Sequence, residues 1–140
     1  MTAADHAWVY VDASALLEWL LAQPRAEEVR QVLAGCRRRV ASDLTVLECS
    51  RALAHSHGSQ QAAAHATLRA LLPTLDLAPV DLALADLLAR PFALEPVRTL
   101  DAIHLATALR LRGPAEAVAM LSLDERMRSN AAALGFALVP

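Results

Sequence analysis

Four acidic side chains in this sequence could act together: Asp12, Glu48, Asp101 and Asp124. Glu48 and Asp101 are set among apolar residues, where a lone ionised carboxylate is costly unless something binds it. Several carboxylates gathered at one place would also repel one another, and a divalent cation removes that repulsion. An all-oxygen ligand set with no cysteine and no clear histidine pair favours Mg²⁺ or Mn²⁺ over Zn²⁺. The residue types therefore predict a site for a hard divalent metal ion.

Taken singly, these acids also have ordinary structural roles open to them. Asp12 could cap a helix, because an Asp at the N-cap accepts a backbone N–H. Asp124 lies inside a capping-box pattern that starts at Ser122, close to the positive end of a helix dipole. Glu48 could be a solvated residue that pairs with Arg51 one turn further on. Their positions in the fold must decide between these readings.

Short apolar runs alternate with longer helical segments along the chain. The predicted strands cover residues 8–11, 40–41, 75–80, 117–121 and 136–139. The predicted helices cover residues 13–22, 25–34, 43–57, 60–72, 81–90, 99–112 and 124–134. Short runs that are apolar on both faces suit a buried parallel sheet. The alternation predicts an α/β fold, a three-layer α/β/α sandwich around a mostly parallel sheet of about five strands. We expect one domain over residues 1–140, with a flexible N-terminus at 1–6.

The glycines are expected to mark helix ends. Each of the four follows a stretch rich in Ala, Leu or Arg, where a residue without a Cβ can adopt a left-handed conformation at no steric cost. They are Gly35, Gly58, Gly113 and Gly135.

The predicted fold can bring the four acids to one place. In an open parallel sheet, ligands gather outside the carboxyl ends of the strands. Asp12 directly follows the first predicted strand, and Asp124 follows the strand at 117–121 after two residues. Asp101 lies in the first turn of one predicted helix and Glu48 one to two turns into another. All four converge if the first strand lies beside the strand at 117–121.

Composition and charge narrow the function further. The chain has 140 residues, 56% of them hydrophobic, and its 13 basic residues are all Arg. The absence of Lys excludes a P-loop lysine, Schiff-base chemistry and a lysine general base. The net charge of −2 argues against binding nucleic acid through bulk positive charge. Once four of the acids face bound cations, however, the Arg residues outnumber the remaining acids.

Cysteine usage and hydropathy bear on the compartment. The two cysteines, Cys36 and Cys49, lack the spacing of a zinc site or a disulfide framework. No apolar run approaches the ~18 residues of a membrane span, and the first residues lack the features of a signal peptide. We expect a cytoplasmic protein with no membrane partner.

Five stretches carry a resemblance to a known family. The sequence resembles a PIN-domain ribonuclease of the short, single-domain type found as VapC-like toxins in bacterial toxin–antitoxin pairs. The four acids occur in the family's order and at its intervals, over almost the whole chain. The matching stretches are Val9–Leu17, Ser42–Glu48, Leu100–Ala108, Leu121–Met127 and Ala131–Phe136.

The resemblance implies a metal-dependent endoribonuclease that hydrolyses RNA phosphodiester bonds. It assigns the metal, Mg²⁺ or Mn²⁺, to the four acids, with Asp12 and Asp101 expected as the principal ligands. Ser14 and Ser122 match polar residues that accompany the first and last acid. The resemblance also implies three partners: an RNA substrate, a cognate antitoxin that covers the active site, and a second copy of the chain in a homodimer.

Some residues outside the acid set have two readings. Arg37, Arg38 and Arg39 could contact RNA phosphates or lie in a solvated loop. Arg98, just before the third motif, is a better candidate for a phosphate or acid contact. His104 could be a general base, but a histidine on an apolar helix is more often packed and hydrogen-bonded, and we favour that reading.

The leucines of the first predicted helix also have two readings. They could serve an interface, because surplus apolar helix surface commonly marks one, or they could belong to the core. They are Leu16, Leu17, Leu20 and Leu21.

Rival functions can be separated from the sequence. A receiver-type phosphoacceptor resembles this fold but requires a Lys, and a D-x-D phosphatase requires a second Asp at the position of Ser14. Both are rejected. A non-catalytic PIN-like module that binds RNA or a protein remains as the alternative.

Overall fold

A five-stranded parallel sheet forms the centre of the molecule, with strand order β3-β2-β1-β4-β5. The computed structural model describes residues 8–114 and 117–140, so the N-terminal segment 1–6 lies outside the described residues. The strands are β1 (Trp8–Val11), β2 (Arg38–Ser42), β3 (Asp76–Ala78), β4 (Val118–Leu121) and β5 (Ala137–Val139). The predicted fold class is confirmed, and every strand pair is parallel.

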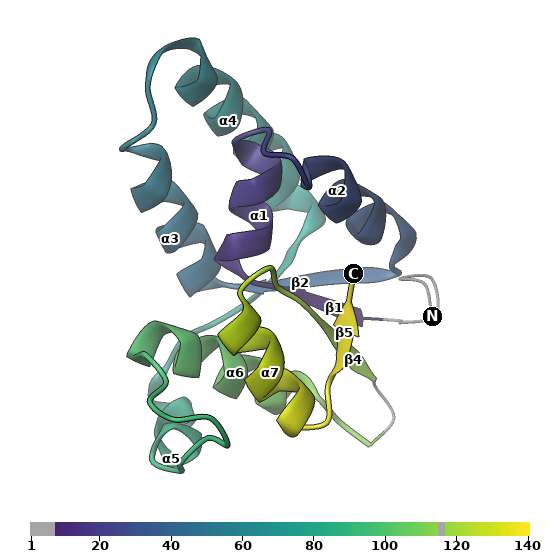
Figure 1. The fold of residues 1–140 in the computed structure, drawn as a ribbon, viewed down its shortest axis with the longest axis vertical. Helices are drawn as coiled ribbons and strands as arrows, with labels where there is room; N and C mark the ends of the chain where they lie inside the picture. Colours follow the sequence, from purple (N-terminus) through teal and green to yellow (C-terminus); the bar gives the residue numbers. More distant parts are fainter. Residues whose placement is uncertain (1–7, 115–116) are drawn as a thin grey trace.

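Helices cover both faces of the sheet, which gives three layers (Figure 1). One face carries α1 (Ala13–Leu20), α2 (Ala26–Gly35), α3 (Asp43–Leu53) and α4 (Gly58–Leu71). The other face carries α5 (Ala85–Leu88), α6 (Thr99–Leu111) and α7 (Glu125–Ala133). Two short 3₁₀ turns, Leu72–Thr74 and Leu82–Leu84, complete the described helical elements. In the part of the chain that the structure describes, no helix is long and apolar enough to cross a membrane.

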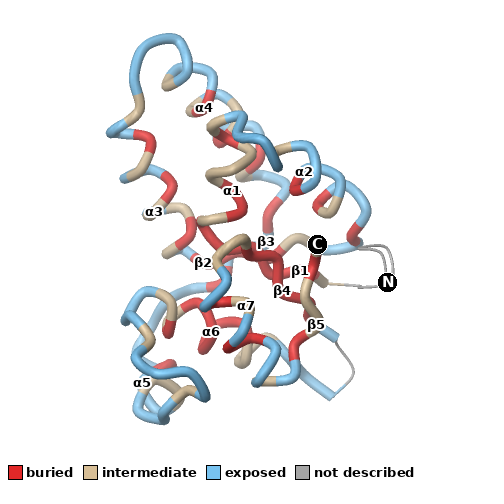
Figure 2. Tube along the Cα trace, in the orientation of Figure 1, coloured by how far each residue is buried: buried red, intermediate tan, exposed pale blue. Residues whose placement is uncertain are grey.

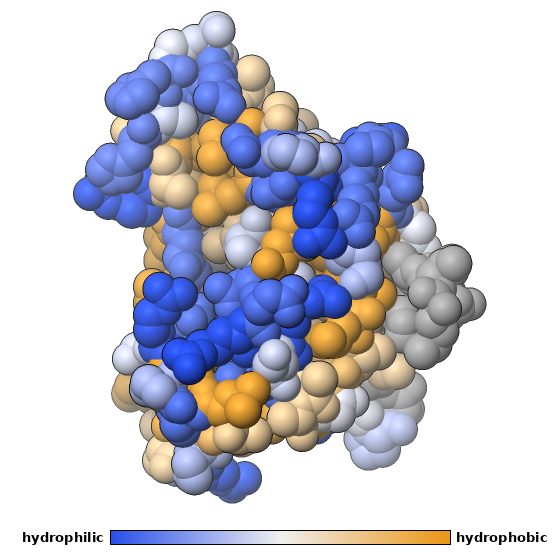
Figure 3. All heavy atoms as spheres, in the orientation of Figure 1, coloured by the Kyte–Doolittle hydropathy of each residue, from blue (hydrophilic) through white to orange (hydrophobic). Residues whose placement is uncertain are grey.

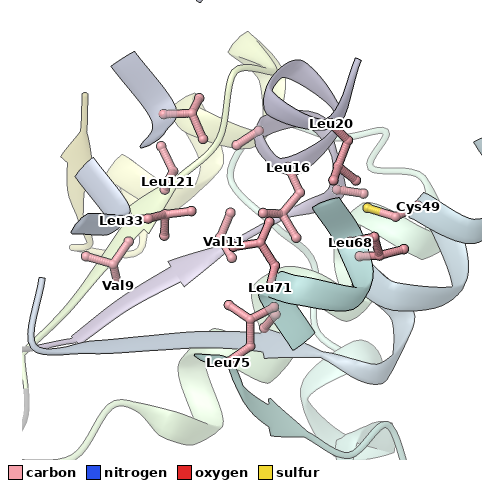
Figure 4. Close-up of a cluster of buried hydrophobic side chains, with 14 of the residues drawn as sticks. Val9, Val11, Leu16, Leu20, Leu33, Cys49, Leu68, Leu71, Leu75 and Leu121 are labelled. Atoms are coloured by element: carbon pink, nitrogen blue, oxygen red, sulfur yellow. The ribbon is translucent and has the colours of Figure 1, made fainter. Parts of the chain in front are cut away.

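Alternation along the central strand divides the core into two clusters. In β1, Val9 and Val11 pack toward α1–α4, whereas Tyr10 packs toward α6 and α7. Figure 2 shows that buried residues are concentrated in the sheet and on the helix sides that face it. Figure 4 shows the first cluster, in which Leu16 and Leu33 meet the two valines from above. The apolar runs that predicted buried strands therefore bury both of their faces.

Charged side chains cover the outer side of α2. The exposed side of α2 carries two ion pairs, Arg25–Glu28 at 2.8 Å and Arg30–Glu27 at 2.5 Å. Figure 3 shows hydrophilic side chains spread over α2 and α7 on this face of the molecule. Solvent screens exposed pairs of this kind, so they contribute little free energy. They keep the helix surface polar and contribute little to its stability.

The leucines of α1 are divided between core and surface. Leu16 is fully buried and Leu20 is 5% exposed, so both belong to the core. Leu17 and Leu21 are partly buried and pack against the same cluster. The interpretation as core residues therefore holds for Leu16 and Leu20, two of the four leucines.

Two predicted helices differ from the observed ones. The predicted helix at 43–57 ends at Leu53, because Ser56 Oγ donates to the Leu53 carbonyl at 2.7 Å and competes with the helical ladder. The predicted helix at 81–90 is a 3₁₀ turn followed by the single turn of α5. Asp81 caps that turn by accepting the Ala83 N–H at 2.9 Å.

Only one of the four glycines ends a helix in the predicted left-handed conformation. Gly135 has φ +89° and follows α7 in a Schellman arrangement, since the N–H of Gly135 donates to Ala132 O and that of Phe136 to Ala131 O. Gly58 has φ +64° but begins α4. Gly113 follows the C-cap of α6, but its φ is not positive; Gly35 is the last residue of α2 and also lacks a positive φ.

Candidate active site

A pocket of about 550 Å³ opens at the carboxyl edge of the sheet. One wall comes from α1 and α3, and the other from α6 and the residue that precedes α7. Three of the four predicted acids line it: Glu48, Asp101 and Asp124. The fourth, Asp12, is 3% exposed and lies behind Ser14, which also lines the pocket.

The sheet register brings Asp12 and Ser122 together. Val11 and Leu121 are paired at the ends of β1 and β4, so the residues that follow them are neighbours. Ser122 Oγ donates to Asp12 Oδ2 at 2.5 Å, and Ser14 Oγ donates to Asp12 Oδ1 at 2.7 Å. The two serine oxygens lie 3.3 Å apart. Both predicted supporting residues therefore orient the first acid.

Asp12 has a structural role as well as a place in the site. Its Oδ1 accepts the backbone N–H of Ala15 at 3.1 Å and so caps α1. Burial raises the pKa of the Asp12 carboxyl above its usual value, and the hydrogen bonds from Ser122 and Ser14 oppose that rise. A positive charge nearby would stabilise the ionised form of this buried carboxylate.

Asp124 is also a capping residue. Its Oδ1 accepts the Met127 N–H at 2.8 Å, so Asp124 is the N-cap of α7. The capping-box pattern suggested Ser122 as the cap, but the hydroxyl of Ser122 donates to Asp12 Oδ2 and accepts the Asp124 N–H at 3.2 Å. Position 124 caps the helix and lines the pocket at once.

Glu48 reaches the pocket from the second turn of α3. That helix begins after Ser42, whose Oγ accepts the Thr45 N–H at 3.2 Å in a capping box. The Glu48 carboxylate pairs with His104 rather than with Arg51: Oε1 lies 2.5 Å from His104 Nε2. The ordinary i,i+3 pairing is thus not formed, although Arg51 lines the same pocket.

His104 is buried and hydrogen-bonded, in agreement with the reading that the sequence favoured. It is 2% exposed, and Tyr10 Oη lies 2.6 Å from its Nδ1. The sequence did not reveal that its second partner is one of the four acids. The three-residue spacing between Asp101 and His104 indicated that His104 lies near the acids, because this spacing places both side chains on one side of α6.

Asp101 stands at the open side of the pocket. Its side chain is 22% exposed, and its Oδ2 accepts a hydrogen bond from Arg98 Nε at 3.2 Å. Arg98 is 81% exposed and lines the pocket beside it. This arginine is therefore placed where an anionic ligand of the pocket could reach it.

The other candidate arginines lie elsewhere. Arg38 begins β2 and so lies at the opposite end of that strand from the pocket. Its Nε donates to Asp76 at 2.8 Å, and its guanidinium stacks 3.9 Å from the centre of the Trp8 ring. Arg39 donates to the Leu33 carbonyl at 2.7 Å. Arg37 precedes β2 and is exposed. The structure does not bring these three residues to the acidic pocket.

The donor atoms of the pocket suit a hard cation. Within residues 8–114 and 117–140, no three Asp, Glu, His or Cys side chains are already grouped closely enough to hold a metal ion. Three carboxylates nevertheless line one pocket, and a fourth is linked to it through Ser14. Carboxylate and hydroxyl oxygens are the ligands that Mg²⁺ and Mn²⁺ prefer. The chemistry of the donor set fits such an ion, which would draw the carboxylates together.

Fold and pocket together define a class: a small, all-parallel α/β domain with an acidic pocket at the carboxyl edge of its sheet. The PIN domain family matches residues 9–133. The chain is 37% identical over 131 residues to Ribonuclease VapC46 of Mycobacterium tuberculosis, a match that covers 94% of this chain and 95% of that protein. The chain belongs to the PIN-domain family.

Solved structures share the fold at lower identity. FitAcB from Neisseria gonorrhoeae superposes with a TM-score of 0.72 at 22% identity, over 94% of this chain and 96% of that chain. VapBC-5 of Mycobacterium tuberculosis, a member of the VapBC family of toxin–antitoxin systems, superposes with a TM-score of 0.59 at 19% identity, over 95% of this chain and 98% of that chain. This chain therefore shares its overall fold with these two solved structures.

Proposed function

We propose that this protein is a divalent-metal-dependent endoribonuclease, the toxin of a toxin–antitoxin pair. The observation that carries the proposal is the convergence of Glu48, Asp101 and Asp124 on one pocket, with Asp12 held behind them. The 37% identity to a ribonuclease over nearly the full length of both chains supports the same activity.

The site residues divide into ligands and supports. Asp12 and Asp101 would be the principal metal ligands, with Glu48 and Asp124 bound directly or through water. A bound Mg²⁺ or Mn²⁺ activates a water molecule and offsets the charge on the phosphate and the leaving oxygen. Ser14 orients Asp12 from the side of the pocket, and its position is supported by the 2.7 Å hydrogen bond to Oδ1.

Arg98 would bind the substrate. Its side chain is 81% exposed at the mouth of the pocket, and among the described residues its guanidinium pairs with Asp101 alone, at 3.2 Å. With Asp101 engaged as a metal ligand, the Arg98 guanidinium would be free to bind an RNA phosphate, for which its planar fork of donors is well suited. Arg37, Arg38 and Arg39 would at most contact RNA far from the scissile bond.

The proposed partners follow from the toxin assignment. A cognate antitoxin would cover the pocket, and two copies of the chain would form a homodimer in the cytoplasm. Leu47 and Leu100, which are 65% and 47% exposed, flank the pocket and offer apolar surface to such a partner. Their place beside the acids is consistent with a partner that blocks the site.

An RNA cleavage assay tests the activity. Purified protein is incubated with end-labelled single-stranded and hairpin RNAs in Mg²⁺ or Mn²⁺, with EDTA and Asp101→Asn as the negative controls. We expect cleavage by the wild type that both controls abolish. The matched variant Glu125→Gln changes an acid that adjoins Asp124 but is 89% exposed and outside the pocket, so it should cleave normally.

Two results would count against the proposal. Cleavage that survives both EDTA and Asp101→Asn would exclude the metal mechanism. Binding of RNA without cleavage under all conditions would favour the alternative, a non-catalytic PIN-like module for RNA or protein binding.

A further inference from the structure

Three side chains from three different elements form a hydrogen-bonded chain beside the pocket. Tyr10 comes from β1, His104 from α6, and Glu48 from α3. Tyr10 Oη lies 2.6 Å from His104 Nδ1, and His104 Nε2 lies 2.5 Å from Glu48 Oε1. The Tyr10 and His104 rings also meet edge to face, with their centroids 5.9 Å apart. The chain thus runs from the buried centre of the sheet to the acidic pocket.

The chain joins the two helical layers. α3 covers one face of the sheet and α6 the other (Figure 1). The Glu48–His104 contact therefore bridges the pocket between its two walls. Tyr10 is fully buried and His104 is 2% exposed, so both rings are fixed by packing. Glu48 is the mobile member, because its side chain is 28% exposed and has three rotatable bonds.

We propose that His104 is a positioning residue that holds the Glu48 carboxylate in place for a divalent cation, and that Tyr10 sets the orientation of the imidazole. This inference rests on the proposed function only in treating Glu48 as a metal ligand. An ionised Glu48 carboxylate can only accept, so we assign the proton of the neutral imidazole to Nε2, which donates to Oε1, and Nδ1 then accepts from the Tyr10 phenol. Within the described residues, Glu48 Oε2 accepts no hydrogen bond and is left for the cation.

A purely structural histidine would behave differently. Tyr10 alone would satisfy the buried nitrogen of such a histidine. Loss of the histidine would then lower the stability of the fold without changing the affinity for a cation. Loss of a residue that supports a metal ligand lowers the affinity for the cation, because the carboxylate must then be ordered at the moment of binding. Partners that orient metal ligands in this way typically contribute about 10–100-fold in metal affinity.

Mn²⁺ affinity of the full chain, measured by electron paramagnetic resonance without RNA, tests the proposal. His104→Leu removes the donor and keeps much of the volume, and it should weaken Mn²⁺ binding by about 10–100-fold. His104→Gln retains an N–H that reaches Oε1, so affinity should return to within about 3-fold of the wild type. Tyr10→Phe removes only the hydroxyl, and it should weaken binding in the same direction by a smaller factor.

A matched control separates support of the ligand from general loss of packing. Thr107 lies one turn further along α6, is fully buried, and donates to the Ile103 carbonyl at 2.7 Å without contacting Glu48. Thr107→Val should lower the melting temperature and leave Mn²⁺ affinity unchanged. Long-range ¹H–¹⁵N spectra should show the Nε2–H tautomer of His104 in the wild type and a mixture of the two tautomers in Tyr10→Phe.

The outcomes distinguish this inference from the proposed function. Wild-type Mn²⁺ affinity in a folded His104→Leu protein would overturn the positioning role. If His104→Leu does not fold, unchanged affinity in Tyr10→Phe together with an Nδ1–H tautomer would overturn it. A wild type that binds Mn²⁺ but cleaves no RNA would remove the ribonuclease activity and leave the positioning role intact. A wild type that binds no Mn²⁺ would overturn both.

Discussion

Asp12 and Asp124 each cap a helix with the carboxylate that we propose as a metal ligand. Asp12 caps α1 and Asp124 caps α7, and each does so through Oδ1. The interpretation of these acids as helix caps and their interpretation as metal ligands therefore do not exclude each other. A cap fixes one oxygen against the helix N-terminus and sets the direction of the whole group, which is what a metal ligand requires. A short polar residue near the end of a strand can cap a helix and also face the pocket, because the helix begins at the next residue.

Ser122→Ala should be destabilising out of proportion to its size. Ser122 is fully buried, donates to Asp12 Oδ2 at 2.5 Å and accepts the Asp124 N–H at 3.2 Å. Its loss leaves a buried carboxylate oxygen and a backbone N–H without a partner, which costs about 1–3 kcal/mol of the free energy of unfolding. Urea denaturation followed by circular dichroism measures this. Ser50→Ala, an exposed site on α3, should remain within about 0.5 kcal/mol of the wild type.

At the scale of elements, two strand-to-helix junctions build the site. In both, a buried parallel strand ends, one or more polar residues follow, and a helix starts away from the sheet edge: β1–Asp12–α1 and β4–Asp124–α7. The two strands are neighbours, so their junctions are neighbours too. α3 and α6 then supply Glu48 and Asp101 from opposite layers. Strand order at the centre of the sheet is therefore the property that assembles the site.

Gly135→Ala should weaken the α7–β5 connection. Gly135 has φ +89°, a conformation that costs other L-residues roughly 1–2 kcal/mol. The nearest atom that a new Cβ would meet is Arg112 Nη1 at 3.5 Å, an ordinary contact, so the cost comes from the backbone. We expect a loss of about 1 kcal/mol in unfolding free energy. Gly113→Ala, which has open space and no positive φ, should be nearly neutral; an equal loss at both sites would contradict this account.

The loop before α6 should be sensitive to acid. The Glu95 carboxylate accepts the N–H groups of Phe92 at 2.8 Å and Val97 at 2.7 Å, and these hydrogen bonds lower its pKa below the usual value. Because the folded pKa lies below the unfolded one, the contribution to loop stability is present above the unfolded pKa and is lost as the pH falls through the folded pKa. The hydrogen-exchange protection of the Val97 amide should therefore decrease between about pH 6 and pH 3.

A variant checks the source of that acid sensitivity. Glu95→Gln cannot ionise, so protection of the Val97 amide should be low already at about pH 6 and should not vary with pH. Glu125→Gln, which leaves the loop unchanged, should keep the wild-type pH profile. The same profile in Glu95→Gln as in the wild type would exclude the carboxylate as its cause.

At the scale of the whole molecule, the pocket lies between two separately packed layers. One core cluster joins the sheet to α1–α4 and the other joins it to α6 and α7. The pocket walls come from both layers, and the Glu48–His104 hydrogen bond crosses between them. A cation held by Glu48 and Asp101 would add a second tie between the layers. Metal binding should therefore stabilise the fold as a whole.

Thermal and chemical denaturation with added Mn²⁺ should show this linkage. A ligand at 100 times its dissociation constant adds about 2.7 kcal/mol to the free energy of unfolding. We expect a stabilisation of this size in the wild type and none in Asp101→Asn, whereas Glu125→Gln should respond as the wild type does. Equal stabilisation of the wild type and Asp101→Asn would place the bound ion outside the pocket.

The sequence alone predicted the parallel α/β class, the positions of the five strands and the convergence of the four acids at one edge of the sheet. These features follow from local signals: apolar runs, caps and the rule that ligands gather at strand carboxyl ends. Several failed predictions were at helix ends, where a single hydrogen bond such as Ser56–Leu53 decides the boundary, and the predicted helix at 81–90 is only a 3₁₀ turn and one helical turn.

The tertiary structure decided which partner each functional side chain has. The sequence offered Arg51 as the neighbour of Glu48, but the fold supplies His104 from 56 positions away, and it supplies Tyr10 to His104 from 94 positions away. It also placed Arg98 at the pocket and Arg38 at the far end of β2. Residues near in sequence share a local pattern that can be read directly. Contacts between distant segments depend on strand order and on the packing of both layers, and these exist only once the chain has folded.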